Sequence, residues 1–217
     1  MDITKARKNV IEQQIRPWGG LNLRANQALS DVPRENFVPE DYQGLVFADM
    51  EIPLGGSAKM FSPKIEGRIL DAVNIQSDET VLEIGTGSGY FTAVLSTLAN
   101  SVVSIEIDQT LSTSAKNNLK SLAINNVDLR TEDASTADFS GQKYDVIILG
   151  CSLNAQSQQL NELLNIGGRL FAIIGSKNKM QATLITRISD NEWEVKSIFE
   201  THLDYMQGQE PAAAFAF

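Results

Sequence analysis

The chain has 217 residues, of which 42% are hydrophobic and 21% charged, values that favour one globular domain with an appendage and argue against a mainly disordered chain. Its net charge of −9 disfavours nucleic acid as a partner, because an acidic surface repels phosphate backbones. A single cysteine, Cys151, excludes an internal disulfide, and with a single histidine, His202, we expect no metal site and no histidine-based triad.

The first 75 residues are predicted to form a helical and loop-rich extension. Apolar residues within 1–14 recur at helical spacing, and Pro17 is expected to end this first helix. Asn22 is a candidate N-cap for a second helix that runs to about residue 30. Two prolines in 32–39 and the breaker-rich stretch 50–57 predict extended or turning chain.

A third helix is expected just after this breaker-rich stretch. Ser62 would be its N-cap and Pro63 its first residue, and apolar residues at helical spacing follow as far as Val73. This helix completes the N-terminal extension.

From residue 80 onward, short apolar runs alternate with helix-length segments. Five strands are expected at 81–84, 102–107, 127–131, 146–149 and 170–174. Helices are expected at 90–98, 109–122 and 155–164, the last of them ending at Gly167-Gly168. This rhythm predicts βαβ units with right-handed crossovers and a mostly parallel sheet.

The last two apolar runs predict an antiparallel ending to the sheet. They span 182–188 and 193–199, and the residues between them, 189–192, suit a hairpin turn. We therefore expect the α/β class, with a Rossmann-like, doubly wound, mostly parallel seven-stranded sheet and a C-terminal antiparallel hairpin.

No apolar run has the length that a membrane span needs. A span takes about 18 apolar residues, and the first residues of the chain lack the apolar core of a secretory signal. We expect a cytoplasmic protein with no membrane partner. The sequence does not indicate an oligomeric state.

The clearest functional pattern is Val-Leu-Glu-Ile-Gly-Thr-Gly-Ser-Gly at 81–89, where a predicted strand enters a glycine-rich turn and then a helix. Gly85, Gly87 and Gly89 allow positive φ angles and close approach of a ligand to the backbone, and N–H groups at a helix start favour electron-rich atoms. A nucleotide-like cofactor is implied. The dinucleotide fingerprint would require glycine where this chain has Tyr90, so a dehydrogenase is the weakest interpretation.

The E-x-G-x-G-x-G spacing resembles the first motif of the class I S-adenosylmethionine (SAM)-dependent methyltransferases. The resemblance implies that Glu83 helps to hold the methionine end of SAM. It also implies that Gly85, Thr86, Gly87 and Gly89 form the turn around the cofactor.

An acidic residue at the end of the second predicted strand supports this interpretation. Glu106 lies 21 residues past Gly85, and an acid near that offset hydrogen-bonds ribose hydroxyls in nucleotide-binding α/β folds. Ile107 follows at the same edge and is included among the cofactor-binding residues. The resemblance further implies that Asp133 contacts the adenine amino group, a role that the neighbouring Glu132 could also fill.

Segments outside the glycine motif are similar to the protein-L-isoaspartate O-methyltransferases, and they are more diagnostic because other SAM methyltransferases do not share them. They read Ile-Glu-Gln-Gln-Ile-Arg at 11–16, Val-Pro-Arg-Glu-Asn-Phe-Val-Pro at 32–39, Asp-Met-Glu-Ile-Pro-Leu at 49–54, Ser-Ile-Glu at 104–106 and Gly-Gly-Arg-Leu at 167–170, together with 81–90. The similarity covers about 9–175. Enzymes of that family methylate the abnormal carboxylate of isoaspartyl residues in damaged proteins or peptides, which starts their repair. The resemblance implies that 76–217 form the SAM-binding domain and that 1–75 form a lid over the acceptor site.

The predicted acceptor loop departs from the family pattern. The family reads Gly-Gln-Thr-Ile-Ser-x-Pro, with its serine facing the acceptor carboxylate, whereas this chain reads Ser-Ala-Lys-Met-Phe-Ser-Pro at 57–63. Lys59 therefore stands at the threonine position and Phe61 at the serine position. An ammonium group at Lys59 could bind an acceptor carboxylate. Ser62 could supply the hydroxyl only if the loop shifts by one residue, so an N-cap is its favoured role. Lys59 and Ser62 are the candidate catalytic residues.

Methyl transfer to a carboxylate requires no general base, because a group with a pKa near 4 is ionised at neutral pH. The protein would contribute alignment of the reacting atoms. Two alternatives stay open: a SAM methyltransferase of the same fold with another acceptor, in an apolar site shaped by Met60 and Phe61, and a SAM-binding module without catalysis. Cys151 is interpreted as a small packing residue.

Overall fold

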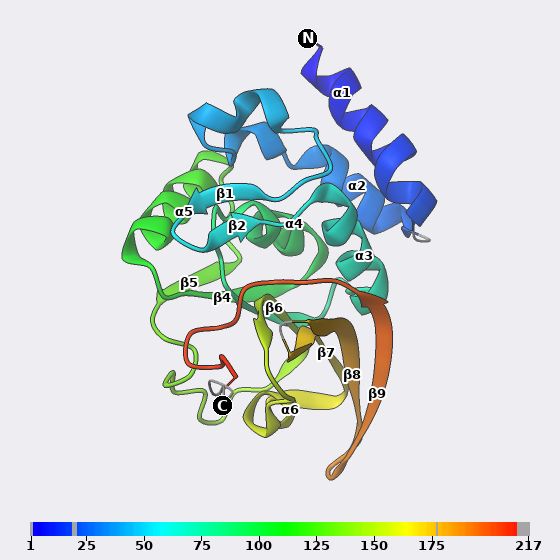
Figure 1. Ribbon diagram of the computed structural model, residues 1–217, viewed down its shortest axis with the longest axis vertical. Helices are drawn as coiled ribbons and strands as arrows, with labels where there is room; N and C mark the ends of the chain where they lie inside the picture. The colour runs from blue at the N-terminus through cyan, green and yellow to red at the C-terminus, as the bar shows by residue number, and fades with distance from the viewer. Residues whose placement is uncertain (1, 19–20, 177, 212–217) are drawn as a thin grey trace, which may run out of the picture.

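A seven-stranded sheet forms the centre of the molecule (Figure 1). The computed structural model describes residues 2–18, 21–176 and 178–211. The strands are β3 (Thr80–Ile84), β4 (Ser101–Glu106), β5 (Val127–Thr131), β6 (Tyr144–Leu153), β7 (Leu164–Ser176), β8 (Lys179–Ser189) and β9 (Glu192–Glu200). Their order is β5-β4-β3-β6-β7-β8-β9, and neighbours are parallel up to β7, whereas β8 is antiparallel to both β7 and β9. This confirms the predicted fold class and the C-terminal hairpin.

The helices agree with most of the predicted ranges. The α-helices described in this part of the chain are α1 (Ile3–Val10), α2 (Leu23–Asp31), α3 (Pro63–Val73), α4 (Tyr90–Leu98), α5 (Gln109–Ser121) and α6 (Gln158–Glu162). Two short 3₁₀ segments, Arg34–Asn36 and Glu40–Leu45, occupy the proline-rich stretch and the residues just after it. After α1 the chain stays helical through a π segment, Ile11–Ile15, and a 3₁₀ turn, Arg16–Trp18. The described helical chain thus continues only one residue past Pro17, to Trp18, which agrees with the predicted stop to within one residue.

Side chains of the central strands alternate between two buried layers. On β6, Val146 and Ile148 belong to one hydrophobic cluster, and Ile147 and Leu149 belong to the other. The first cluster joins the strands to α2, α3 and α4, and the second joins them to α6. Because helices cover both faces of the sheet, the sequences of these strands are continuous apolar runs.

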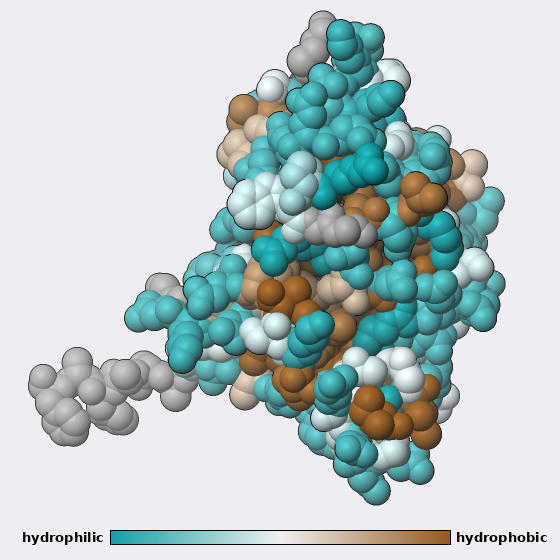
Figure 2. Space-filling model, turned by 90° about the vertical axis from the view of Figure 1, so that its right-hand side faces the viewer, coloured by the Kyte–Doolittle hydropathy of each residue, from teal (hydrophilic) through white to brown (hydrophobic). Residues whose placement is uncertain are grey.

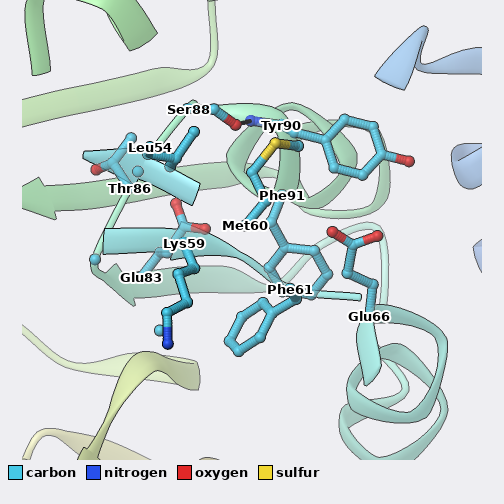
Figure 3. A pocket seen from close by; sticks show the side chains of 13 residues that line it. Leu54, Lys59, Met60, Phe61, Glu66, Glu83, Thr86, Ser88, Tyr90 and Phe91 are labelled. Carbon is cyan, nitrogen blue, oxygen red and sulfur yellow. Dashed lines mark hydrogen bonds between the residues drawn. The ribbon is translucent and has the colours of Figure 1, made fainter. Parts of the chain in front are cut away.

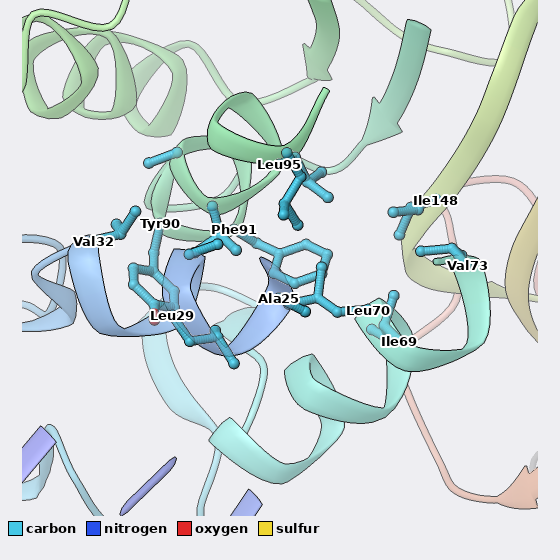
Figure 4. Packing of buried hydrophobic residues seen from close by; sticks show 14 of the residues in the cluster. Ala25, Leu29, Val32, Ile69, Leu70, Val73, Tyr90, Phe91, Leu95 and Ile148 are labelled. Carbon is cyan, nitrogen blue, oxygen red and sulfur yellow. The ribbon is translucent and has the colours of Figure 1, made fainter. Parts of the chain in front are cut away.

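The N-terminal extension shares the first of these clusters. Leu29 of α2, Leu70 of α3 and Leu95 of α4 are all at most 2% exposed and pack in the same layer (Figure 4). Full burial of one such side chain contributes about 1.5–3 kcal/mol. The extension is therefore held against the sheet by ordinary core packing.

The predicted helix at 155–164 is wrong at both ends. The helix α6 covers only Gln158–Glu162, and Gly167 and Gly168 lie inside β7. A Cβ on Gly168 would lie 2.9 Å from the carbonyl oxygen of Asn165 and 3.0 Å from that of Asp145. The pairing of β6 with β7 shifts register nearby. The two glycines therefore permit an irregular, close strand pairing and do not stop a helix.

The caps of α2 and α3 differ from one another. The side chain of Asn22 accepts the N–H of Ala25 at 2.8 Å, which confirms the predicted cap of α2. Ser62 occupies the N-cap position of α3, but its hydroxyl makes no capping hydrogen bond. Asp49 Oδ1 accepts the N–H of Lys64 at 3.1 Å in its place. A distant side chain has thus taken over the predicted role of the serine.

The breaker-rich stretch forms a hairpin that the sequence did not predict. The strands are β1 (Ile52–Gly55) and β2 (Ala58–Met60), which pair antiparallel. Gly55 and Gly56 turn the chain with φ angles of 114° and 55°. In Figure 1 this hairpin lies beside α4. It also approaches the turn after β3, because a Cβ on Gly87 would lie 3.1 Å from Cδ1 of Leu54.

The outer strand β9 forms one edge of the sheet. The side of the molecule that carries β9 is mostly hydrophilic, with apolar side chains interrupted by polar ones (Figure 2). Ile188 and Val195, each 48% exposed, are among the exposed apolar residues of β8 and β9. The helices of the described part of the chain are all too short or too polar to cross a bilayer.

Candidate functional site

Two adjoining cavities lie at the carboxyl ends of β3, β4 and β6, the edge where ligands bind in parallel α/β sheets. The larger has a volume of about 360 Å³, within the range of small-molecule sites. The smaller, of about 30 Å³, lies between β2 and the start of α4. Lys59, Gly85, Gly87 and Gly150 line both cavities, so the two cavities lie side by side.

The glycine turn supplies bare backbone to both cavity walls. Gly85 and Gly87 have φ angles of 96° and 56°, values that favour glycine. A Cβ on Gly85 would lie 3.4 Å from the Cα of Gly150, and a Cβ on Gly150 would lie 2.9 Å from the carbonyl oxygen of Gly85. The ends of β3 and β6 therefore approach each other too closely for side chains.

The structure does not bring every predicted turn residue to the larger cavity. Gly89 begins α4 with a φ of 82° and lines neither cavity. A Cβ there would lie 3.1 Å from the Cβ of Ala115, so this glycine allows α4 and α5 to touch. Thr86 is buried and lines only the smaller cavity, and its hydroxyl is 2.6 Å from that of Ser104.

Glu83 lies beneath the turn with 2% of its surface exposed, and it lines the smaller cavity. Its Oε2 atom accepts hydrogen bonds from the hydroxyls of Thr92, at 2.5 Å, and Ser104, at 2.6 Å. Burial raises the pKa of Glu83 to about 7, and the hydrogen bonds from these two hydroxyls oppose that shift. Thr92 and Ser104 therefore fix the orientation of this carboxylate beneath the glycine turn.

Glu106 ends β4, lines the larger cavity and is 6% exposed. Its Oε2 atom accepts the N–H of Gly87 at 2.8 Å, and its Oε1 atom accepts the N–H of Asp108 at 3.0 Å. One carboxylate thus holds both the glycine turn and the start of α5. Each oxygen keeps a second lone pair that a ligand hydroxyl can use.

The residues just after β4 and just after β5 form another wall of the larger cavity. Ile107, Glu132 and Asp133 all line it, and Ile107 is 49% exposed. The Oδ1 atom of Asp133 also accepts the N–H of Ser135 at 2.8 Å. The structure therefore brings both candidate adenine-binding acids to the cavity.

Acidic side chains dominate the lining of the larger cavity. Among the described residues these are Glu106, Glu132, Asp133, Asp204 and Glu210. Lys59 is the one cationic side chain in the described lining of either cavity. An acidic cavity favours cationic ligands, and SAM carries two cationic groups, a sulfonium and an ammonium. The acidic lining and the glycine cradle therefore fit this cofactor.

Of the two candidate catalytic residues, only Lys59 reaches the cavities. Lys59 lies on β2, and its Nζ atom is 3.1 Å from Oδ2 of Asp204 and 3.5 Å from Oε2 of Glu51. Ser62 is 8% exposed and lines neither cavity.

Phe61 turns its ring toward the smaller cavity. The ring packs edge to face on that of Phe91, with centroids 5.9 Å apart (Figure 3). Met60 lines the same cavity. The smaller cavity is therefore apolar at the position where the family pattern has a hydroxyl.

A buried arginine holds the backbone of this loop in place. Arg34 is 3% exposed, and its Nη1 atom donates to both carboxylate oxygens of Glu66, at 2.6 and 2.7 Å. Its Nη2 atom donates to the carbonyl oxygen of Phe61 at 2.7 Å, and its Nε atom donates to that of Val46 at 3.2 Å. The guanidinium also lies over the ring of Tyr90, 4.8 Å from the centroid. Glu66 and Tyr90 lie at the opposite end of the smaller cavity from Lys59 (Figure 3).

The chain after β9 returns across the sheet and forms the remaining wall of the larger cavity (Figure 1). We call residues 203–210 the C-terminal segment. Three hydrogen bonds join it to Ser152 of β6. The N–H of Ser152 donates to the carbonyl oxygen of Asp204 at 2.9 Å, its hydroxyl donates to that of Leu203 at 2.9 Å, and the N–H of Met206 donates to the carbonyl oxygen of Ser152 at 2.8 Å.

Several residues of this site were missed from the sequence. Gly150 carried a usable signal, because a glycine follows an apolar run at a predicted strand end. Arg34 lies in a motif that matched the family pattern, but nothing there indicated its partner Glu66. Cys151, interpreted as a packing residue, also lines the larger cavity, and burial raises the pKa of its thiol to about 12. The C-terminal segment carried no recognisable signal.

Comparison with known proteins identifies relatives along nearly the whole chain. Residues 5–206 match the family model described as protein-L-isoaspartate(D-aspartate) O-methyltransferase (PCMT). The chain is 32% identical over 210 residues to protein-L-isoaspartate O-methyltransferase 2 of Marinobacter nauticus, covering 96% of both proteins. It is 35% identical over 192 residues to a protein-L-isoaspartate O-methyltransferase of Syntrophus aciditrophicus, covering 88% of both.

Solved structures share the fold. A chain from Plasmodium falciparum, assigned as a protein-L-isoaspartate O-methyltransferase and in complex with S-adenosyl-L-homocysteine, has a TM-score of 0.81 at 17% identity. The alignment covers 93% of this chain and 98% of that one. A second protein-L-isoaspartate O-methyltransferase structure has a TM-score of 0.82 at 24% identity and covers 95% of this chain and 66% of that one.

Proposed function

The chain belongs to the protein-L-isoaspartate(D-aspartate) O-methyltransferase family of SAM-dependent carboxyl methyltransferases, and we propose that it methylates isoaspartyl carboxylates of proteins or peptides through the site described above. The observation that carries the proposal is that the two cavities adjoin and share four lining residues. The glycine turn and the acidic wall lie on one side, and the cation of Lys59 lies where the cavities join.

The larger cavity would hold the cofactor. Gly85 and Gly87 offer bare backbone, Glu106 offers lone pairs for the ribose hydroxyls, and Asp133 or Glu132 offers an acceptor for the adenine amino group. When bound, SAM supplies an electrophilic methyl group, which bonds to a carboxylate oxygen while its bond to sulfur breaks and the sulfonium becomes a neutral thioether.

The residues of the acceptor side would position the carboxylate, and none has to remove a proton from it. The ammonium of Lys59 can bind the acceptor carboxylate through a charge-assisted hydrogen bond. Arg34 fixes the backbone at Phe61 and so sets the shape of the apolar wall. Alignment of this kind can lower a barrier by several kcal/mol.

We include the N-terminal extension, 1–75, in the proposal as the acceptor-site lid, with 76–217 as the SAM-binding domain. Support comes from the hairpin β1–β2, which contributes Leu54, Lys59 and Met60 to the smaller cavity. The cytoplasmic location stays a prediction from the sequence.

Transfer of labelled methyl from SAM to a synthetic isoaspartyl peptide tests the proposed activity, with the normal aspartyl twin of the peptide as control. We expect transfer to the isoaspartyl peptide alone. Transfer to neither peptide by folded protein that binds S-adenosylhomocysteine would leave the alternative of a different acceptor or of a binding module.

Replacement of Phe61 separates these alternatives further. Phe61→Ser restores the hydroxyl of the family pattern, and Phe61→Ala removes the ring without adding a hydroxyl. A gain in transfer by the serine variant alone would indicate an isoaspartyl enzyme weakened by its phenyl ring. Equal effects of the two variants would mean that the volume of the apolar wall controls the acceptor.

A further inference from the structure

The cation at the junction of the two cavities is already paired with a carboxylate of the same chain. Lys59 Nζ lies 3.1 Å from Oδ2 of Asp204, which lines the larger cavity. The second partner, Glu51, is 3.5 Å away and is absent from the described lining of both cavities. From the cavity side, the charge of Lys59 is therefore neutralised by Asp204.

The backbone around Asp204 is anchored, whereas its side chain faces the cavity. Ser152 accepts or donates three hydrogen bonds to 203–206, and the hydroxyl of Tyr205 donates to the carbonyl oxygen of Gly175 at 2.9 Å. The side chain of Asp204 remains 48% exposed and that of Lys59 40% exposed. Rotation of the Asp204 side chain would break the ion pair without moving the chain that carries it.

We propose that Asp204 determines acceptor specificity. Its carboxylate occupies the position beside the Lys59 ammonium that the acceptor carboxylate takes, so an acceptor binds by displacing the carboxylate of Asp204 from Lys59. This inference rests on the proposed function, in which Lys59 binds the acceptor. A neutral group such as a side-chain amide offers no charge in exchange and leaves the Lys59–Asp204 pair intact. The exchange therefore selects ionised acceptors.

The state of Lys59 agrees with such an exchange. Lysine is cationic at neutral pH at its ordinary pKa, and the hydrogen bond to Asp204 raises the pKa of the Lys59 ammonium further. Both side chains are well exposed, and pairs of this kind are weak. Displacement of Asp204 should therefore change acceptor affinity only by about two- to fivefold.

A binding assay tests the exchange without requiring turnover. The probe is a fluorescent isoaspartyl peptide, titrated against protein saturated with S-adenosylhomocysteine and followed by anisotropy. We expect Asp204→Asn to tighten peptide binding about two- to fivefold. Lys59→Gln should weaken binding, and adding Asp204→Asn to Lys59→Gln should bring no gain, because the benefit depends on the freed ammonium.

Two matched controls separate the exchange from general electrostatics. Glu210→Gln removes a negative charge from the same segment and cavity, and Glu51→Gln removes the other carboxylate beside Lys59. We expect a smaller gain from each than from Asp204→Asn. Calorimetry of S-adenosylhomocysteine on each variant, including Asp204→Asn, separates any change in cofactor affinity from the change in peptide affinity.

Specific results would overturn the inference. One is a gain in peptide affinity from Glu210→Gln equal to that from Asp204→Asn, and another is a gain from Asp204→Asn that persists in the Lys59→Gln background. A changed cofactor affinity in place of a changed peptide affinity would also overturn it. So would the absence of peptide binding by both wild type and Asp204→Asn. Peptide binding without methyl transfer would remove the proposed function alone, because the exchange is measured by affinity.

Discussion

The proposed cofactor side and the proposed acceptor side of the site are built in different ways. Gly85 and Gly87 follow β3, and Glu106 ends the adjacent strand β4. The carboxylate of Glu106 joins the glycine turn to the start of α5 through backbone N–H groups. The acceptor side depends on long-range side-chain pairs, such as Arg34 with Glu66 and Lys59 with Asp204. One side is thus specified mainly by backbone geometry and the other by contacts between distant segments.

This difference indicates where the family function can vary. The close approach of β3 to β6 leaves little room for side chains in the turn, because a Cβ on Gly150 would lie 2.9 Å from a carbonyl oxygen. At the acceptor loop the backbone is held through the carbonyl oxygen of Phe61, so the side chain at that position is not part of the restraint. The loop can therefore exchange a hydroxyl for a phenyl ring while its backbone stays in place.

The largest effect is expected on the acceptor side, at the buried ion pair. Arg34→Met leaves the carboxylate of Glu66 buried without its partner, which should lower the free energy of unfolding by about 3–5 kcal/mol. Urea unfolding measures this loss. The double variant Arg34→Met/Glu66→Leu removes both charges and should recover most of it. A single variant as stable as the wild type would contradict the role given to this pair.

The next effect concerns the pH dependence contributed by Glu83. Because burial raises its pKa from 4.5 to about 7, the folded protein holds an extra proton between these values, and its free energy of unfolding falls as pH rises through that window. The fall should be on the order of 3 kcal/mol. Glu83→Gln removes it, so the stability of this variant relative to wild type should increase between pH 5 and pH 8. A difference that does not change with pH in thermal unfolding would refute the raised pKa.

Replacement of Glu106 tests the backbone-centred design of the cofactor side. Glutamine has one acceptor oxygen in place of two and carries no charge, and the backbone N–H groups of Gly87 and Asp108 already compete for it. Glu106→Gln should therefore lose a charge-assisted hydrogen bond to a ribose hydroxyl, worth about 1.5–3 kcal/mol. Calorimetry should show an S-adenosylhomocysteine affinity about 10- to 100-fold lower. Glu132→Gln and Asp133→Asn are the matched controls, and the larger loss between them identifies the residue that contacts adenine. An unchanged affinity for Glu106→Gln would remove this residue from the cofactor site.

The smallest expected effect is a loss of stability from alanine at Gly89, compared with alanine at Gly141. The comparison separates the cost of backbone strain from the cost of crowding between helices. Gly89→Ala forces a positive φ and places a Cβ 3.1 Å from that of Ala115, whereas Gly141→Ala forces a similar φ with no atom within 4 Å. We expect losses in unfolding free energy of about 2 and about 1 kcal/mol, respectively. Equal losses would show that the contact between α4 and α5 relaxes freely.

Much of the fold could be predicted because its signals are local. The strands at 81–84 and 146–149 and the helix at 90–98 were found from runs and spacings that lie within one element. The prediction failed at Gly167 and Gly168, where a glycine pair has two meanings and only the pairing of β6 with β7 decides between them. It also failed at Ser62, whose capping role passed to Asp49, 13 residues earlier in the chain.

The sequence by itself determined the fold class, the glycine turn and the family, because these depend on periodicity, on backbone freedom and on short motifs. Only the tertiary structure decided that Lys59 meets Asp204 and that Arg34 meets Glu66 and the carbonyl oxygen of Phe61. The residues of each pair lie 145 and 32 positions apart in the chain, and no local pattern encodes such a separation. Which charged side chains come into contact depends on how every intervening element packs, and the proposed acceptor side is built from such long-range contacts.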